Sequence, residues 1–130
     1  MTSSTEVLAV GGGPAGLTVS ALLSRSGVRV TVVEEHRSVG EPPHCAGLVS
    51  LRGLRTLYPW LPLGELVLNE VRGAFIVGPE AELCVDAGRP VAAVLDRVAF
   101  DRALLELALS EGTEVRTGCR FLGAGLGPLG

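Results

Sequence analysis

The segment Gly11-Gly12-Gly13-Pro14-Ala15-Gly16 constrains the fold of this chain more than any other part of the sequence. It follows an apolar strand predicted over residues 6–10 and opens a helix predicted over residues 14–25. A second strand, rich in β-branched residues, is expected over residues 28–33. Strand, turn, helix and strand together form a βαβ unit, whose two strands are parallel.

The glycines of this segment fit the dinucleotide-binding pattern GxGxxG, and each has a separate physical task. Gly11 permits the tight turn from strand to helix. Gly13 lets the backbone approach a pyrophosphate, and Gly16 allows the helix to pack closely on the strand. Pro14 and Ala15 fill the first helical turn, whose N–H groups and dipole face the anion.

An acidic residue, Glu34, ends the second predicted strand at about the spacing at which such folds bind a ribose. A carboxylate there disfavours a 2′-phosphate, so FAD or NAD is expected rather than NADP. Glu35 either shares this role or is a surface charge. A phosphate-binding P-loop is excluded because Leu17 stands where that motif needs lysine, and all 11 basic residues of the chain are arginine.

The rest of the chain is predicted to continue an α/β fold. After a proline-containing loop over residues 40–47, we expect a helix over 48–58, strands over 67–77 and 81–85 around a turn, a strand over 91–95, a helix over 97–110 and a strand over 114–117. Asp96 is the expected N-cap of the second long helix. This reading gives one domain over residues 1–122, with inserted strands at about 67–95, and a glycine-rich tail over 123–130.

Composition and charge exclude several classes of function. The net charge of −3 and an aromatic content of 4% argue against nucleic-acid binding. The uncharged run over residues 7–24 is broken by glycines and proline, so no transmembrane segment is expected. The three cysteines form no CxxC pair, so neither a metal site nor a disulfide framework is indicated, and a cytoplasmic location is expected.

Two further segments carry a resemblance to a known family. The first is Gly40-Glu41-Pro42-Pro43-His44-Cys45-Ala46-Gly47-Leu48-Val49-Ser50, and the second begins Leu95-Asp96-Arg97 and continues with Phe100-Asp101, Leu104, Ala108, Gly112 and Val115. With the glycine segment they cover the chain to about residue 121, which resembles the geranylgeranyl reductase family of FAD-dependent oxidoreductases. That family lies in the p-hydroxybenzoate hydroxylase-like flavoprotein superfamily. The resemblance implies a Rossmann-like FAD/NAD(P)-binding βαβ domain with an inserted antiparallel hairpin, incomplete at the C-terminus.

The resemblance also implies roles for individual residues. The pyrophosphate of FAD would lie against the glycine turn and Arg97, whose forked guanidinium suits a phosphate. Glu34 would bind the adenosine ribose, and Phe121, or its neighbour Arg120, would lie at the adenine. The residues implied to line the flavin and its ribityl chain are Cys45, Ala46, Gly47 and Leu48. No catalytic residue is assigned.

The implied activity of the complete enzyme is reduction of isoprenoid C=C bonds, and the chain resembles the N-terminal part of such an enzyme. The substrate would be an isoprenoid or another hydrophobic small molecule, and the reductant NAD(P)H or a ferredoxin-type protein. This segment alone is expected to lack full activity, and the full-length enzyme is expected in the cytoplasm or peripheral to a membrane. Two alternatives stay open: part of a flavin-dependent aromatic monooxygenase, and a non-catalytic nucleotide-binding module or truncated remnant.

Overall fold

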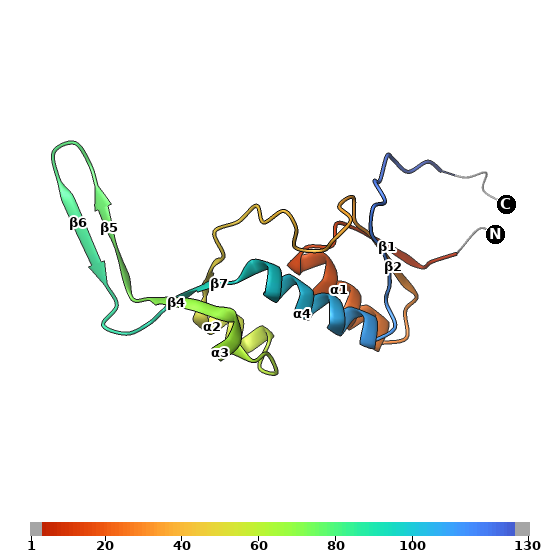
Figure 1. Cartoon of the computed structure of the whole chain (residues 1–130), viewed down its shortest axis with the longest axis horizontal. Coiled ribbons are helices and arrows are strands. Elements are labelled where there is room, and N and C mark those ends of the chain that lie inside the picture. Colours follow the sequence, from red (N-terminus) through yellow and green to blue (C-terminus); the bar gives the residue numbers. More distant parts are fainter. Residues whose placement is uncertain (1–3, 127–130) are drawn as a thin grey trace. The chain divides into compact units, whose positions relative to one another are not determined.

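The computed structural model describes residues 4–126, and residues 127–130 of the predicted tail lie outside this range (Figure 1). The elements are β1 (Val7–Val10), α1 (Pro14–Arg25), β2 (Val30–Val33), β3 (Leu48–Ser50), α2 (Leu51–Leu57), α3 (Leu63–Leu66), β4 (Val67–Val71), β5 (Gly73–Val77), β6 (Glu82–Asp86), β7 (Ala92–Leu95), α4 (Arg97–Ser110) and β8 (Glu114–Arg116). They form two compact units. The first contains described residues 4–42 and 101–126, and the second contains Pro43–Phe100.

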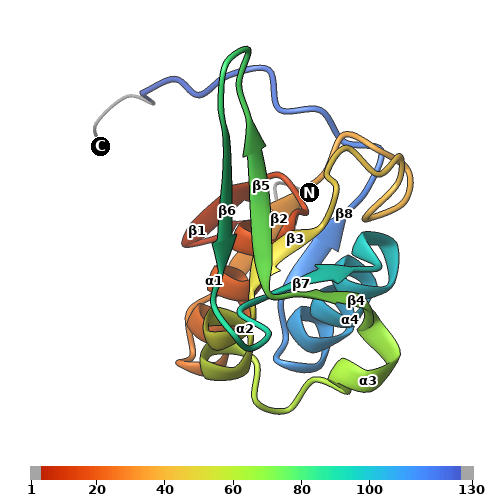
Figure 2. The same cartoon turned by 90° about the vertical axis from the view of Figure 1, so that its left-hand side faces the viewer.

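The first unit is built on a parallel sheet with the strand order β1-β2-β8, in which α1 connects β1 to β2 (Figure 2). The predicted βαβ unit is therefore confirmed, and α1 has the bounds expected from the sequence. Val10 at the end of β1 pairs with Val33 at the end of β2. This register aligns the carboxyl ends of the two strands, so the residues that follow them become neighbours.

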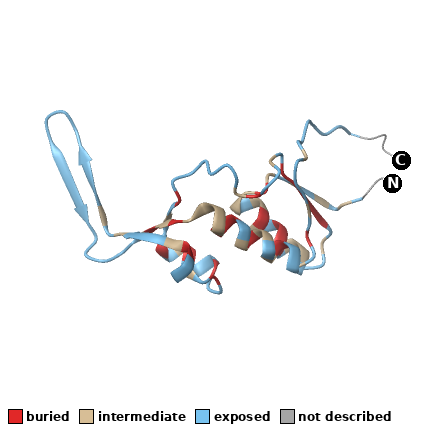
Figure 3. Ribbon diagram, viewed as in Figure 1, coloured by how far each residue is buried: buried red, intermediate tan, exposed pale blue. Residues whose placement is uncertain are grey.

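The core of the first unit lies between the sheet and the long helices. Its buried side chains come from α1, β2 and α4 and include Leu17, Ala21, Val30, Val32, Leu104 and Ala108 (Figure 3). An unbroken apolar run such as that of β1 is typical of a parallel strand buried on both faces, but one face of β1 is exposed in the described chain. Leu8 is 44% exposed and Val10 is 58% exposed, because no described element covers that face of β1.

One polar atom in this core has no partner among the described residues. The Oγ atom of Ser20, on the buried side of α1, forms no hydrogen bond. Because a buried, unpaired hydroxyl costs free energy and alanine favours a helix, Ser20→Ala is expected to raise the free energy of unfolding by about 1 kcal/mol. Ser24→Ala is the matched control, since it removes a 2.8 Å hydrogen bond to Thr113 and should destabilise. Urea denaturation measures both, and a less stable Ser20→Ala protein would contradict the prediction.

The second unit contains an antiparallel sheet with the order β3-β7-β4. The sequence predicted a helix over residues 48–58, and its first three residues are instead β3, paired with β7. The leucine spacing is helical from Leu51 onward, and Ser50 caps α2 by accepting a hydrogen bond from the N–H of Gly53 at 3.2 Å. Pairing with a distant strand thus overrides the local pattern at the start of this segment. The short helix α3 was not predicted.

The inserted hairpin is formed by β5 and β6, which pair from Gly73 with Asp86 to Val77 with Glu82. The sequence predicted one strand over residues 67–77, but the chain divides it at Arg72. Consequently β4 joins the sheet with β7, and among the described strands β5 pairs with β6 alone. Arg72 forms an ion pair with Asp86 at the base of the hairpin. Both hairpin strands are exposed along nearly all their length (Figure 3).

Helix α4 begins at the residue predicted for it, and Asp96 is its N-cap. The Oδ1 atom of Asp96 accepts a hydrogen bond from the N–H of Ala99 at 3.0 Å. Phe100 packs edge-on against buried Tyr58, with ring centroids 5.5 Å apart. Tyr58 also meets Trp60 edge-on at 6.0 Å. These aromatic rings therefore pack against one another in the second unit.

Candidate cofactor site

The turn between β1 and α1 closes so tightly that it requires glycine at two positions. Gly11 has a φ of +100°, a conformation that other residues rarely adopt. A Cβ atom on Gly16 would lie 2.3 Å from the carbonyl oxygen of Gly11. Gly16 therefore allows the helix to approach the turn itself, whereas the sequence pattern predicts close packing of the helix on the strand.

The third glycine of the pattern, Gly13, faces open space at the start of α1. It is the N-cap residue in extended conformation, and a Cβ atom there would meet nothing within 4 Å. Pro14 follows at the first helical position and Ala15 is exposed. The first N–H groups of a helix lack partners within it, and its dipole is positive at this end. The residues present therefore fit an approaching phosphate, which glycine at position 13 leaves room for.

The Glu34 carboxylate lies beside this turn and is nearly buried, with its side chain 12% exposed. Its Oε2 atom accepts a hydrogen bond from the N–H of Gly12 at 2.6 Å. Its Oε1 atom accepts from the N–H of His36 at 2.8 Å and contacts Nδ1 of the same residue at 2.6 Å. Burial raises the pKa of the Glu34 carboxyl, but the N–H groups of His36 and Gly12 and the His36 ring together hold the pKa below its usual value.

This lowered pKa predicts how stability depends on pH. The stabilisation from ionised Glu34 is present above its unfolded-state pKa of about 4.5 and is lost as the pH falls through the folded-state pKa. Glu34→Gln is expected to lower the free energy of unfolding by about 1–3 kcal/mol near neutral pH. The difference from the wild type should shrink in acid.

Denaturant titrations across this pH range measure the difference. Glu65→Gln is the control, because Glu65 is exposed on α3 and its replacement should change stability by less than about 0.5 kcal/mol. A Glu34→Gln protein that loses the same stability at every pH would contradict the assignment.

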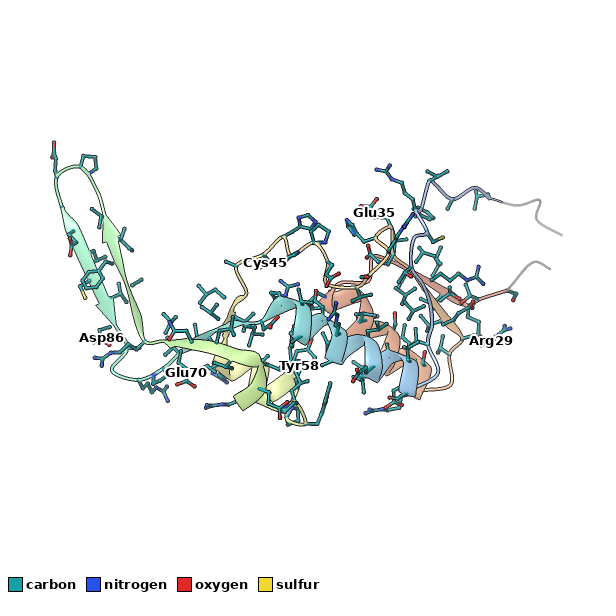
Figure 4. The ribbon with its side chains drawn as sticks, in the orientation of Figure 1. Arg29, Glu35, Cys45, Tyr58, Glu70 and Asp86 are labelled. Atoms are coloured by element: carbon teal, nitrogen blue, oxygen red, sulfur yellow. The ribbon has the colours of Figure 1, made fainter. Side chains whose placement is uncertain are left out.

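A pocket of about 260 Å³ opens at the carboxyl ends of β1 and β2, beside the segment that follows β8. Glu35, on the segment after β2 (Figure 4), lies at the rim of this pocket and forms an ion pair with Arg120 at 3.2 Å. The residues that line the pocket are Val10, Gly11, Val33, Glu34, Glu35, His36, Cys119, Arg120 and Phe121. The fold thus brings Glu34, Glu35 and Phe121, which the sequence singled out separately, to one cavity.

The remaining predicted site residues lie in the second unit. Gly47 has a φ of +78°, and a Cβ atom there would lie 2.5 Å from the carbonyl oxygen of Leu95 and 3.2 Å from Cγ of Arg97. The fold therefore brings Gly47 and Arg97 together, and only glycine fits at residue 47. Cys45, on the loop before β3 (Figure 4), contacts the N–H of Gly47 through Sγ at 3.4 Å. Cys45 and Ala46 are exposed on this loop, and Leu48 is exposed at the start of β3.

Sequence reasoning missed two residues of the first unit. Gly12 occupies a variable position of the glycine pattern, yet a Cβ atom there would lie 3.2 Å from Oε2 of Glu34. His36 carries no motif of its own, and only its place two residues after Glu34 could have drawn attention to it. The contact of Gly12 with Glu34 is not visible in the sequence, because it depends on the parallel register of β1 and β2, whereas the contact of His36 with Glu34 is local.

Within residues 4–126, no group of three or more histidine, cysteine, aspartate or glutamate side chains could hold a metal ion. Across the same residues, no helix has the length and apolar character needed to cross a membrane.

Comparison with known proteins gives matches along most of the chain. The model of a family described as FAD binding domain matches residues 4–125. A digeranylgeranylglycerophospholipid reductase of Thermoplasma volcanium is 33% identical over 115 residues, covering 85% of this chain and 29% of the relative. Digeranylgeranylglycerophospholipid reductase 1 of Methanococcoides burtonii is 34% identical over 123 residues, covering 91% of this chain and 29% of the relative.

A solved structure shows the same fold. The crystal structure of a geranylgeranyl bacteriochlorophyll reductase-like protein from Thermoplasma acidophilum is similar with a TM-score of 0.77 and 31% identity. The similarity covers 88% of this chain and 30% of that one. The chain thus spans about three tenths of the length of these relatives. The resemblance to the geranylgeranyl reductase family, drawn from three sequence segments, is confirmed.

Proposed function

The chain belongs to the FAD binding domain family, and from this premise we propose that it is the FAD-binding, N-terminal part of an oxidoreductase that reduces isoprenoid C=C bonds. The observation that carries the proposal is that an open helix N-terminus at Gly13 lies next to the buried Glu34 carboxylate. The N–H of Gly12 connects the two by its hydrogen bond to Glu34. A diphosphate needs the first group and a ribose needs the second. FAD carries both in one molecule.

The first unit would hold the ADP half of FAD. We assign the pyrophosphate to Gly11, Gly13, Pro14, Ala15 and Gly16. Glu34 would accept hydrogen bonds from the ribose hydroxyls, with Glu35 at the rim of the same pocket. Phe121, which lines this pocket, would lie against the adenine. Negative charge at Glu34 and Glu35 supports selection against a 2′-phosphate.

The second unit would hold the flavin half. Cys45, Ala46, Gly47 and Leu48 are assigned to the flavin and ribityl chain, where small residues and backbone groups fit best. Arg97, which packs against Gly47, is assigned to the pyrophosphate. In this proposal residues 1–122 form one FAD-binding domain with inserted strands at about residues 67–95.

The names of the relatives supply the proposed substrate class. Those relatives are reductases of digeranylgeranylglycerophospholipids, so a geranylgeranyl chain on a lipid is the proposed substrate of the complete enzyme. Reduced FAD supplies hydride for such a reaction, and the protein supplies binding, orientation and electrostatics. NAD(P)H or a ferredoxin-type protein is the proposed reductant. We place the complete enzyme in the cytoplasm, peripheral to the membrane that holds its lipid substrate.

Titration of the chain with FAD tests the cofactor proposal. Saturable quenching of flavin fluorescence, with a shift of its absorbance spectrum, is the expected result. NADP⁺ should not compete, because its 2′-phosphate would meet Glu34. Failure to bind FAD at millimolar concentration by a folded chain would overturn the proposal.

The substrate proposal needs the complete protein. Incubated with a geranylgeranyl lipid and chemically reduced FAD, it should yield products that have gained two hydrogens per double bond, measured by mass spectrometry. Oxygenated products from an aromatic substrate would support a monooxygenase instead.

A further inference from the structure

The Glu34 carboxylate has fewer free hydrogen-bond acceptor positions than the two hydroxyls of a ribose need. An ionised carboxylate offers about four acceptor positions, two on each oxygen. Among the described residues, three of them are used: Oε2 accepts from Gly12 N–H, and Oε1 accepts from both the N–H and the ring of His36. Because an ionised carboxylate can only accept, Nδ1 of His36 carries the proton in this contact. One acceptor position is left, on Oε2.

A ribose presents two neighbouring hydroxyls, at its 2′ and 3′ positions, and both donate when they bind a carboxylate bidentately. One of the three present donors must then leave. The two backbone N–H groups are fixed by the turn after β1 and by the chain after β2. The His36 ring is 40% exposed and can rotate away about its side-chain bonds.

We propose that the His36 ring competes with the ribose of FAD for Glu34, so that FAD binding displaces the ring and His36 sets the affinity of the ribose site. This inference rests on the proposed FAD site. It assigns to His36 a role in tuning affinity through Glu34 and not a contact with the flavin.

The competition makes affinity depend on pH. Histidine is the side-chain type whose charge changes between pH 5 and 8. A neutral ring already donates to an ionised carboxylate, and a protonated ring adds the attraction of an ion pair to that hydrogen bond. Displacing the ring is therefore harder in acid. FAD binding should release a proton at low pH, and affinity should rise as the pH increases.

The other charged groups around the ring belong to residue types other than histidine. Glu34, Glu35 and Arg37 lie on the same segment, and Glu35 is paired with Arg120. The segment after β8 adds Cys119 and Arg120 to the pocket, and β8 itself contributes Arg116, whose carbonyl accepts from the N–H of Glu34. The turn after β1 adds only glycines. None of these side chains is of the type that changes charge between pH 5 and 8.

Calorimetric titration of the chain with FAD at about pH 6 and about pH 8 tests the proposal. For the wild type we expect binding to be about fivefold weaker at the lower pH. Measurement in two buffers of different ionisation enthalpy should show proton release on binding. His36→Ala should bind FAD equally at both pH values, more tightly than the wild type at the lower one, without proton release. His36→Asn, which keeps a neutral donor, should also lose the pH dependence.

The other histidine of the chain supplies the control. His44→Asn, on the loop of the second unit, should keep the pH dependence of the wild type. If the wild type binds FAD equally at both pH values, or if His36→Ala binds more weakly than the wild type at both, the competition is refuted while the FAD site stands. If the wild type binds no FAD at either pH, the proposed function fails and this inference fails with it.

Discussion

Gly13→Val is expected to abolish FAD binding while leaving the chain folded. A side chain at residue 13 meets no protein atom within 4 Å, and the backbone there is extended with a φ of −80°, so valine causes neither clash nor strain. The same open space is where the pyrophosphate would approach the first turn of α1. A branched side chain there blocks this approach, and we expect an affinity loss of at least about 100-fold, or about 2.7 kcal/mol.

Two measurements separate this outcome from unfolding. Circular dichroism and urea denaturation should show a native protein, destabilised by no more than about 1 kcal/mol from the poorer N-cap. Calorimetry should show the loss of FAD binding. Gly64→Val is the matched control, because a Cβ atom at residue 64 on α3 also meets nothing within 4 Å. Unchanged FAD affinity in Gly13→Val would place the phosphate elsewhere.

Gly16→Ala is expected to disrupt the fold of the first unit. The added Cβ atom would lie 2.3 Å from the carbonyl oxygen of Gly11, and no relaxation of a flexible side chain can relieve a contact with the backbone. Gly11 has little freedom to move, because its N–H donates to the carbonyl of Val33 at 2.8 Å and its φ is +100°. We expect a loss of about 3 kcal/mol or more in the free energy of unfolding.

Thermal and urea denaturation in the absence of FAD measure this effect directly. The control is Gly53→Ala in α2, where the added Cβ atom would lie in ordinary contact with Ser50, at 3.6 Å. That variant should be as stable as the wild type or more stable, because alanine favours a helix over glycine. A Gly16→Ala protein with wild-type stability would show that the turn is looser than described.

Gly13→Val and Gly16→Ala are expected to show that two glycines of one sequence motif have different physical roles. Gly13 and Gly16 occupy successive fixed positions of GxGxxG, and a motif search treats them alike. Their surroundings differ, since one glycine leaves room for a ligand and the other leaves room for the backbone. Binding is expected to fail first at Gly13, and folding at Gly16.

The sequence predicted the parts of this protein that depend on local order. The helices over Pro14–Arg25 and Arg97–Ser110 have the expected bounds, because apolar periodicity, proline at a helix start and an aspartate N-cap act within a few residues. The glycine turn and the acidic strand end at Glu34 were visible for the same reason. From them followed the parallel βαβ unit and the expectation of FAD or NAD. The family resemblance implied FAD in particular, and the family match bears this out.

Only the tertiary structure decided what depends on pairing between distant segments. The strand β3 exists because Leu48 pairs with Val94, and the run over residues 67–77 is divided at Arg72 because its halves join different sheets. The site was decided in the same way. Gly12 reaches Glu34, 22 residues away, only because β1 and β2 end in register, and that register brings the glycine turn to the carboxylate that His36 contacts locally. Local sequence sets which conformations a segment favours, whereas strand pairing sets which segments meet.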